Sequence, residues 1–285
     1  MSILRPLIRK VFSAVKRLEA WATPDPWDGH DFTKDDTAYP WLSWATRQVC
    51  AHFNHPAYAW GTLLGCLYAQ RLAIKRVSVI EFGVAGGRGL LALEGIAQRA
   101  GALLNLQVDT YGFDTGTGLP KPVDYRDRPN AFAEGDFAMD FTALRGRLRT
   151  AQLILGDIAI TLQRFLAGGP APIAFISMDV DLYSSTVAAL QVLDAMTHSL
   201  LPRIPVYFDD VIGFSTGDCN GELLAIADFN ATHQTRKVSM VPGLRYFITP
   251  PYRDQSWVEM MYLAHTFDHP LYNVYDGFAR RTLPL

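Results

Sequence analysis

The sequence predicts an α/β domain in which a mostly parallel sheet lies between two layers of helices. Short apolar runs rich in β-branched residues alternate with longer stretches of helical spacing, which is the pattern of repeated strand–helix units. Acidic residues follow several of these runs directly. Ligands bind at the carboxyl ends of strands in such sheets, so these acids are the first candidates for a functional site.

The first strand–helix unit is expected in residues 77–91, which read VSVIEFGVAGGRGLL. An apolar run is followed by four glycines, and a helical apolar pattern begins at Leu90. Glycine lets the backbone approach a ligand closely, and a helix start offers unpaired N–H groups. The dinucleotide spacing G-x-G-x-x-G fails here, whereas E-x-G-x-x-x-G fits with Glu81, Gly83 and Gly87. The alternative is a glycine turn that only packs the strand on the helix.

The remaining elements follow in order along the chain. Strands are expected at about residues 106–113, 152–155, 173–178 and 204–208, with two short strands at 237–241 and 244–249 around Pro242-Gly243. Helices are expected at 58–73, from the glycine loop to about 100, and at 222–230. Residues 121–150 are polar and irregular, and 126–130 are expected to be a mobile excursion of the kind that often closes over a site. We divide the chain into an extension of helices and loop, 1–60, and a main domain, 61–285.

Two single acids follow the second and third expected strands. In nucleotide-binding α/β folds, an acid at the end of the second strand accepts hydrogen bonds from ribose hydroxyls, which makes Asp114 a candidate, with Thr115 beside it. Asp157 follows the third strand and is either a ligand contact or a plain helix N-cap.

Four further acids follow the fourth and fifth strands: Asp179, Asp181, Asp209 and Asp210. Adjacent strands lie about 4.8 Å apart, so carboxylates at neighbouring carboxyl ends converge, and a hard divalent cation removes their repulsion. Oxygen ligands favour Mg²⁺, with Mn²⁺ or Ca²⁺ as substitutes, and disfavour zinc. The alternative is that all four are helix caps and solvated turn residues.

These motifs resemble those of a known enzyme group. E-x-G-x-x-x-G resembles the first motif of class I S-adenosylmethionine-dependent methyltransferases, and DVDLYSST with the later FDD resembles the macrocin and sugar O-methyltransferase group. The resemblance covers about residues 77–250. It departs at 201–205, LPRIP, where the group has a Gly-Gly turn. It implies a Rossmann-like three-layer sandwich with a seven-stranded sheet and a C-terminal antiparallel hairpin, preceded here by N-terminal helices.

The resemblance also implies a function and a set of site residues. The cofactor would be S-adenosylmethionine, and the acceptor a hydroxyl of a small molecule such as a sugar, polyketide or other natural product. The cofactor-binding candidates are Glu81, Gly83, Ala85, Gly87, Asp114, Thr115 and Asp157. The metal ligands would be Asp179, Asp209 and Asp210, with Asp179 also a candidate base. His265 is a second candidate for proton transfer, as is His269, although a lone histidine is more often structural.

Three other readings stay open. An apolar strand followed by Asp-x-Asp also marks metal-dependent glycosyltransferases, although the glycine loop and Asp114 argue against one. A phosphatase would use Asp179 and Asp181 but needs a later Lys and Ser or Thr that we cannot place. A non-catalytic cofactor-binding protein is the third reading, and the intact acid cluster argues against it.

Composition excludes several partners. Among 285 residues, 26 basic and 28 acidic side chains give a net charge of −2, so nothing global favours nucleic acid. Three scattered cysteines indicate reduced thiols in a cytoplasmic protein. Residues 2–21 predict a basic amphipathic helix. We expect it to pack on its own domain or on a second copy of the chain, rather than on an anionic membrane surface.

Overall fold

The computed structural model describes residues 55–248 and 252–274 of the chain. The predictions for the basic helix at 2–21 and for the extension ahead of residue 55 lie outside the described residues. Within the described part, no helix is long and apolar enough to cross a membrane.

A seven-stranded sheet forms the centre of the described part, in the order β3-β2-β1-β4-β5-β7-β6. The strands are β1 Arg76–Phe82, β2 Gln107–Asp114, β3 Gln152–Leu155, β4 Ile173–Met178, β5 Arg203–Phe208, β6 Arg236–Met240 and β7 Met261–Thr266. The first five are parallel, and β7 runs antiparallel to both β5 and β6. The predicted fold class, a mostly parallel seven-stranded sheet closed by an antiparallel pair, is confirmed.

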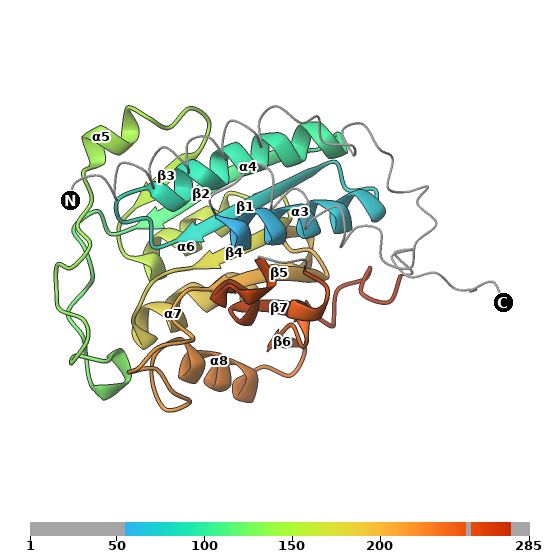
Figure 1. The fold of residues 1–285 in the computed structure, drawn as a ribbon. Helices are drawn as coiled ribbons and strands as arrows, with labels where there is room; N and C mark the ends of the chain where they lie inside the picture. Colours follow the sequence, from blue (N-terminus) through green and yellow to red (C-terminus); the bar gives the residue numbers. More distant parts are fainter. Residues whose placement is uncertain (1–54, 249–251, 275–285) are drawn as a thin grey trace, which may run out of the picture.

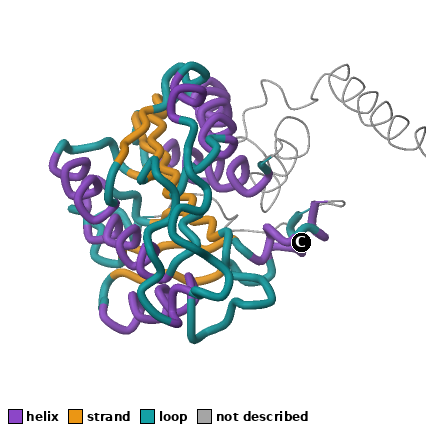
Figure 2. Tube along the Cα trace, turned by 90° about the vertical axis from the view of Figure 1, so that its left-hand side faces the viewer, coloured by secondary structure: helices purple, strands orange, loops and turns teal. Residues whose placement is uncertain are grey.

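Helices cover both faces of this sheet (Figure 1). They are α3 Pro56–Arg71, α4 Arg88–Leu104, α5 Phe141–Arg145, α6 Ile158–Ala167, α7 Tyr183–Leu190 and α8 Gly221–Thr232. Short 3₁₀ helices span Tyr125–Asp127, Gln191–Asp194, Thr197–Ser199, Leu244–Tyr246, Tyr252–Asp254 and Ser256–Glu259. One face is covered by α3 and α4, the other by α6, α7 and α8. Seen end on, helices flank the strands on both sides (Figure 2).

The core lies between these layers and explains the apolar runs of the sequence. Every residue of β4 is buried, as is every residue of β1 after Arg76. Strands of a parallel sheet that is covered on both faces read as continuous apolar runs, which is why these two were recognisable. The side chains of Phe82 and Phe113 pack with ring centroids 4.9 Å apart, so neighbouring strand ends are also joined by aromatic contacts.

The second half of the predicted hairpin was wrong. Residues 244–246 form a 3₁₀ turn after Gly243, whose φ is +69°, and the strand that pairs with β6 is Met261–Thr266. The chain therefore leaves β6, makes three 3₁₀ turns and returns between β5 and β6.

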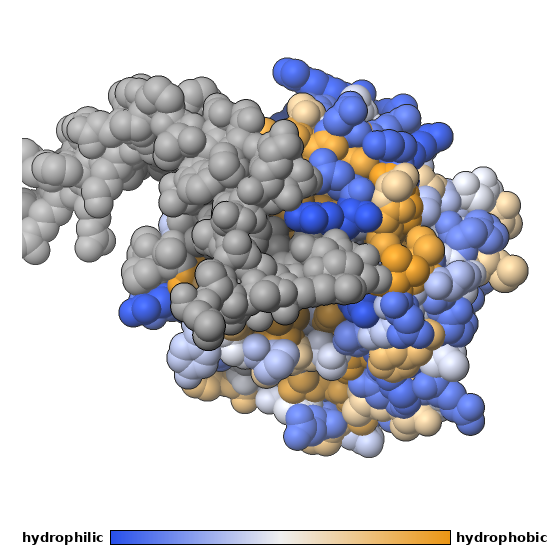
Figure 3. Space-filling view, turned by 90° about the vertical axis from the view of Figure 1, so that its right-hand side faces the viewer, coloured by the Kyte–Doolittle hydropathy of each residue, from blue (hydrophilic) through white to orange (hydrophobic). Residues whose placement is uncertain are grey.

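The strand directions divide the sheet into two edges. The carboxyl ends of β1, β2, β4 and β5 meet at the edge that faces the viewer in Figure 2, where loops cross in front of the strands. Figure 3 shows the opposite end of the molecule, where an apolar band lies between hydrophilic regions. Because the candidate acids follow the strands, they lie at the carboxyl edge.

Candidate functional site

The glycine loop after β1 is bent so closely against its neighbours that glycine is required at two positions. Gly83 has φ +83°, and a Cβ atom there would overlap the carbonyl oxygen of Asp179. Gly87 has φ +79°, and a Cβ atom there would overlap the side chain of Leu144. Both φ values lie in the region that L-residues avoid. The two glycines of the predicted E-x-G-x-x-x-G motif are therefore a backbone requirement of this loop.

The same loop leaves the start of α4 without a side-chain cap. Its N-cap is Gly87, which makes no side-chain hydrogen bond. The first N–H groups of a helix have no partner within the helix, and they carry partial positive charge. This helix start borders a cavity of about 520 Å³, the Glu81 cavity, which is lined by His55, Pro56, Ala57, Tyr58, Glu81, Val84, Ala85, Gly86, Gly87, Arg88, Gly89, Asp179, Tyr207, Asp209 and Trp257. The helix start and Arg88 therefore lie on the wall of this cavity together with the acids Glu81, Asp179 and Asp209.

A second cavity of about 280 Å³ lies on the other side of the loop. This Asp114 cavity is lined by Gly83, Ala85, Phe113, Asp114, Thr115, Gly118, Leu119, Pro120, Asp136, Phe137, Ile158, Asp179, Val180, Asp181, Ser185 and Asp209. Ala85, Asp179 and Asp209 line both cavities. The two spaces therefore adjoin at the carboxyl ends of β4 and β5.

Asp114 braces the glycine loop as well as lining its cavity. Its Oδ2 accepts hydrogen bonds from the backbone N–H groups of Val84 and Ala85, both at 2.9 Å, and its Oδ1 accepts one from Gly116 at 2.6 Å. An ionised carboxylate has about four acceptor positions, so one remains for a ligand. Asp114 therefore lines the cavity with one acceptor position open, and its role toward a cofactor stays a prediction.

The two other candidates at these strand ends have different surroundings. Thr115 lines the Asp114 cavity, but its hydroxyl donates to the carbonyl of Gly118 at 2.7 Å. Asp157 is exposed, and its Oδ1 accepts from the N–H of Ala159 at 2.8 Å as the N-cap of α6. It does not line the Asp114 cavity, whereas its neighbour Ile158 does. The simple N-cap reading of Asp157 accounts for its position.

Glu81 is a fully buried acid on the wall of its cavity. The hydroxyl of Tyr58 donates to its Oε1 at 2.7 Å, and its Oε2 has no hydrogen-bond partner. Burial raises the pKa of Glu81 well above its usual range, and the charges of Asp179 and Asp114 add to this. An unsatisfied buried carboxyl is costly, and a bound ammonium group would remove that cost.

Asp179 stands where the two cavities meet. Burial raises its pKa to about 8, and the nearby charges of Asp209 and Asp210 contribute. No hydrogen bond to this carboxylate is present among the described residues, so its oxygens are free toward the cavities. A carboxyl whose pKa lies near physiological pH is suited to accept a proton from a substrate.

The other acids of the predicted cluster are already engaged. Asp209 Oδ1 accepts from the hydroxyl of Tyr207 at 2.5 Å. Asp210 Oδ1 lies 3.4 Å from Nη2 of Arg128, a side chain that is only 3% exposed. Among the described residues, no three His, Cys, Asp or Glu side chains are grouped so that they could hold a metal ion. The assignment of Asp179, Asp209 and Asp210 as metal ligands stays a prediction.

The structure does not bring His265 to this edge. It pairs with Arg203, the first residue of β5, whereas Asp209 follows the last residue of that strand. A six-residue strand is about 20 Å long, so His265 cannot exchange protons with a ligand beside Asp179. Its Nδ1 bonds the hydroxyl of Tyr272 at 2.8 Å. His269, which follows β7, is also remote from the acids and is buried.

Sequence reasoning missed several residues of this edge. Tyr58 comes from α3, ahead of the first strand, and reaches Glu81 across 23 positions of chain. Asp127 and Arg128 lie in the segment that was expected to be mobile, yet both are buried. Glu222, in α8, is fully buried, and its Oε2 accepts from the N–H of Asp210 at 3.0 Å. The available signal for Asp127 and Arg128 was a pair of opposite charges lying between Tyr125 and Phe132.

Comparison with known proteins gives a likeness of fold. No family model matches the chain, and no curated protein does. Among solved structures, the calicheamicin methyltransferase CalS11 is 24% identical, covering 85% of this chain and 99% of its own, with a TM-score of 0.48. The O-methyltransferase TomG from Streptomyces achromogenes, in complex with S-adenosylmethionine, is 14% identical over 84% of this chain and 93% of its own, with a TM-score of 0.34. MycE, in complex with Mg and S-adenosylhomocysteine, is 17% identical over 80% of this chain and 54% of its own, with a TM-score of 0.38. At these values an activity has to be read from the chain's own site.

Proposed function

We propose that this chain is an S-adenosylmethionine-dependent methyltransferase that acts on a hydroxyl group of a small molecule. The observation that carries the proposal is the position of Asp179. It is a half-buried carboxylate without a hydrogen-bond partner in the described structure, and it lies where a glycine-loop cavity and an acid-lined cavity meet. A proton acceptor at such a junction serves the transfer of a group from one bound molecule to another.

The residues of the two cavities fit the two ends of S-adenosylmethionine. The free acceptor position of Asp114 suits a ribose hydroxyl, and Phe113 and Ile158 give an apolar wall beside it. In the other cavity, the uncapped start of α4 and Arg88 suit a carboxylate, while the unpartnered Oε2 of Glu81 suits an ammonium group. The cofactor's centre would then lie next to Ala85 and Asp179.

The chemistry requires little of the protein beyond positioning and one proton transfer. When bound, S-adenosylmethionine supplies a sulfonium methyl group, which the acceptor oxygen takes as the S–C bond breaks and S-adenosylhomocysteine is left. Asp179 accepts the proton that the hydroxyl loses. The walls hold the two reactants in line, which is the larger part of the acceleration in a reaction of this kind.

The acceptor space is the part of the Glu81 cavity beyond Asp179. Tyr58, Tyr207 and Trp257 line it, together with Asp209. Aromatic side chains with an acceptor beside them suit a hydroxylated ring, as in a sugar, polyketide or other natural product. The predicted divalent cation, Mg²⁺ or in its place Mn²⁺ or Ca²⁺, does not enter this proposal, because Asp210 is already paired with Arg128.

The first test measures which cofactor the protein binds. Calorimetry with S-adenosylhomocysteine and with UDP-glucose should give heat of binding for the first and none for the second. Binding of the sugar nucleotide alone would favour the glycosyltransferase alternative. Methyl transfer from labelled S-adenosylmethionine to a panel of hydroxylated sugars and phenols then separates an enzyme from a non-catalytic cofactor-binding protein.

The cofactor assignment makes a specific prediction for Asp114. Asp114→Ala removes a hydrogen-bonding charged group from the wall and its two hydrogen bonds to the glycine loop, so binding of S-adenosylhomocysteine should weaken by about 1.5–3 kcal/mol. Asp157→Ala is the matched control, because that acid is an exposed N-cap outside the cavity. Equal affinity in Asp114→Ala and the parent protein, measured by calorimetry, would remove Asp114 from the cofactor site.

A further inference from the structure

Arg128 is a buried cation at the acidic edge. Its Nη2 donates to the carbonyl oxygen of Asp181 at 2.7 Å and lies 3.4 Å from Oδ1 of Asp210, while its Nη1 donates to Oγ1 of Thr216 at 2.8 Å. Its guanidinium carbon also lies 4.7 Å from the ring centroid of Phe132. A guanidinium that is 3% exposed and bonded in two directions is fixed in position.

The neighbouring residue, Asp127, anchors the segment that carries Arg128. Asp127 is 1% exposed and accepts hydrogen bonds from the N–H groups of Val123 and Ser184, both at 2.8 Å, and from the hydroxyl of Ser184 at 3.0 Å. It therefore joins the segment after β2 to the start of α7. The backbone of Arg128 has φ +53°, a conformation that persists only where its surroundings determine it.

The position of Arg128 decides what Asp210 can do. A carboxylate that is paired with a fixed guanidinium has lost oxygen lone pairs that a metal ion would need. A divalent cation beside Asp210 would also be repelled by the positive charge of Arg128. The backbone N–H of Asp210 bonds Glu222, and its side chain shares a hydrogen bond with Asp181. Asp210 is thus held on the Arg128 side and lines neither cavity.

We propose that Arg128 is a positioning residue that replaces a divalent cation at this edge, neutralising Asp210 so that methyl transfer by this chain does not require a metal ion. The statement about methyl transfer rests on the proposed function. The statement that Arg128 keeps a divalent cation away from Asp210 concerns the folded protein alone. Arg128 also holds together the segment after β2 and the loop after β5, both of which border the reaction space. It acts through the acids it holds and does not itself reach a substrate.

The test is a comparison of Mn²⁺ binding, followed by electron paramagnetic resonance, in the full-length protein and its variants. The parent protein should show no binding at micromolar Mn²⁺. Arg128→Met frees Asp210 while preserving the side chain's apolar length, and it should bind Mn²⁺ at least tenfold more tightly than the parent. Arg128→Lys keeps the charge and should behave as the parent does. Arg126→Met is the matched control, because Arg126 lies two residues away with its charge paired to Asp124 outside the cluster.

Two further measurements distinguish a failure of this inference from a failure of the proposed function. Treatment with EDTA should leave S-adenosylhomocysteine binding and methyl transfer by the parent protein unchanged. Tight Mn²⁺ binding by the parent that is lost in Asp210→Asn, or loss of transfer upon chelation, would overturn the role of Arg128. No gain of Mn²⁺ binding in a folded Arg128→Met would also overturn it. Failure to bind S-adenosylhomocysteine would instead overturn the proposed function, and the Mn²⁺ comparison would still decide the inference because it needs no cofactor.

Discussion

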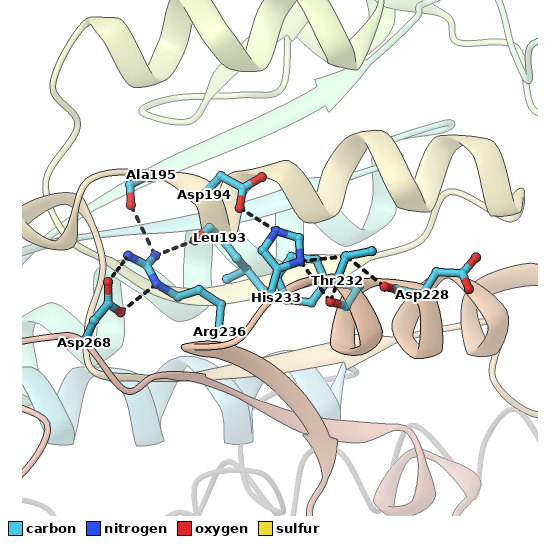
Figure 4. A network of polar contacts seen from close by, with 9 residues as sticks. Leu193, Asp194, Ala195, Asp228, Thr232, His233, Arg236 and Asp268 are labelled. Carbon is cyan, nitrogen blue, oxygen red and sulfur yellow. Dashed lines mark hydrogen bonds and ion pairs between the residues drawn. The ribbon is translucent and has the colours of Figure 1, made fainter.

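At the carboxyl ends of β1 and β4, Glu81 and Asp179 are acids without a partner of opposite charge in the described structure. Burial raises the pKa of both, and nearby acids raise it further. Around β6 and β7, on the same sheet, the acids are paired (Figure 4). Arg236 makes two bonds to Asp268, at 2.8 and 2.9 Å, and its Nη1 donates to the carbonyl oxygens of Leu193 and Ala195.

A histidine completes the paired region. The Nε2 of His233 lies 2.9 Å from Oδ1 of Asp194, and its Nδ1 lies 2.9 Å from the carbonyl oxygen of Phe229. The hydroxyl of Thr232 donates to the carbonyl oxygen of Asp228 at 2.9 Å (Figure 4). These bonds join the segment after α7 to the end of α8 and to β6. Their effect is to fix three elements relative to one another.

The contrast separates polar groups that stabilise the fold from those that serve a reaction. Buried charge is tolerated where it is paired and hydrogen-bonded, and it costs stability where it is not. Clusters of acids with raised pKa values occur at functional sites, where a bound ligand or a transferred proton offsets the repulsion between them. We therefore expect removal of the unpaired acid Asp179 to reduce turnover and raise stability, and removal of a paired group around β6 and β7 to lower stability and leave turnover unchanged.

The largest effect is expected for Asp179→Asn. Loss of the base should lower turnover by about 100- to 10,000-fold, with S-adenosylhomocysteine affinity retained. In the parent, Asp179 becomes a base only as the pH passes its pKa of about 8, so kcat/KM should rise with pH through that value, and the variant should lose this rise.

Asp179→Asn also tests how the ionisation of this acid affects the free energy of unfolding. Because the pKa of Asp179 is raised by folding, its ionisation opposes folding, and the parent loses stability as the pH rises from about 4 toward 8. Asp179→Asn should therefore unfold at higher denaturant concentration than the parent at pH 8.5. Unchanged turnover together with unchanged stability would show that the acid is an ordinary surface residue.

A somewhat smaller effect is expected for Gly83→Ala, which tests the close packing that forms the edge. The added Cβ would overlap the carbonyl oxygen of Asp179 at a positive φ, and we expect a loss of about 2–4 kcal/mol in the free energy of unfolding. Gly86→Ala is the matched control in the same loop, because a Cβ there meets nothing within 4 Å. Equal urea midpoints for the two variants would contradict this account of the loop.

In the paired region, Arg236→Met should cost about 1.5–3 kcal/mol of unfolding free energy, because it leaves Asp268 and two carbonyl oxygens without their charged donor. Turnover of the folded variant should stay within twofold of the parent. Arg245→Met is the control, since its ion pair with Glu259 is about half exposed on both sides and such pairs contribute little. A loss of turnover in Arg236→Met at temperatures where it is folded would contradict the claim that this region only stabilises the fold.

The sequence was sufficient to predict those parts of the molecule that depend on local patterns. The strands β1 and β4 are buried on both faces and so read as continuous apolar runs, and Gly83 and Gly87 mark a backbone that only glycine allows. The acids Asp114 and Asp179 were recognisable because the carboxyl end of a strand is a position in the sequence as well as in space. These predictions required no knowledge of which segments pack together.

What the sequence could not show are the contacts that long-range packing creates. Arg128 meets Asp181 and Thr216 across 53 and 88 positions of chain, so a segment rich in charge looked mobile although it is anchored. The strand that covers β5 was missed because a nearby Pro-Gly turn gave a stronger local signal than the apolar run at 261–264. The same limitation placed His265 among the candidate catalytic residues.

The smallest effect is expected for His265→Gln, and it decides whether the two regions are functionally separate. Burial and the charge of Arg203 lower the pKa of His265, which favours the neutral imidazole, and the ring lies at the amino end of β5 beside Tyr272. Glutamine keeps a polar group of similar length, so turnover and its pH dependence should match the parent within twofold, with at most about 1 kcal/mol lost in stability. Steady-state rates from pH 6 to 9 are the measurement, with Asp179→Asn as the reference for a true loss of proton transfer. A drop of tenfold or more in turnover without a change in unfolding would mean that the paired region takes part in the reaction, because no contact in the described structure connects this ring to the acids at the other end of the strand.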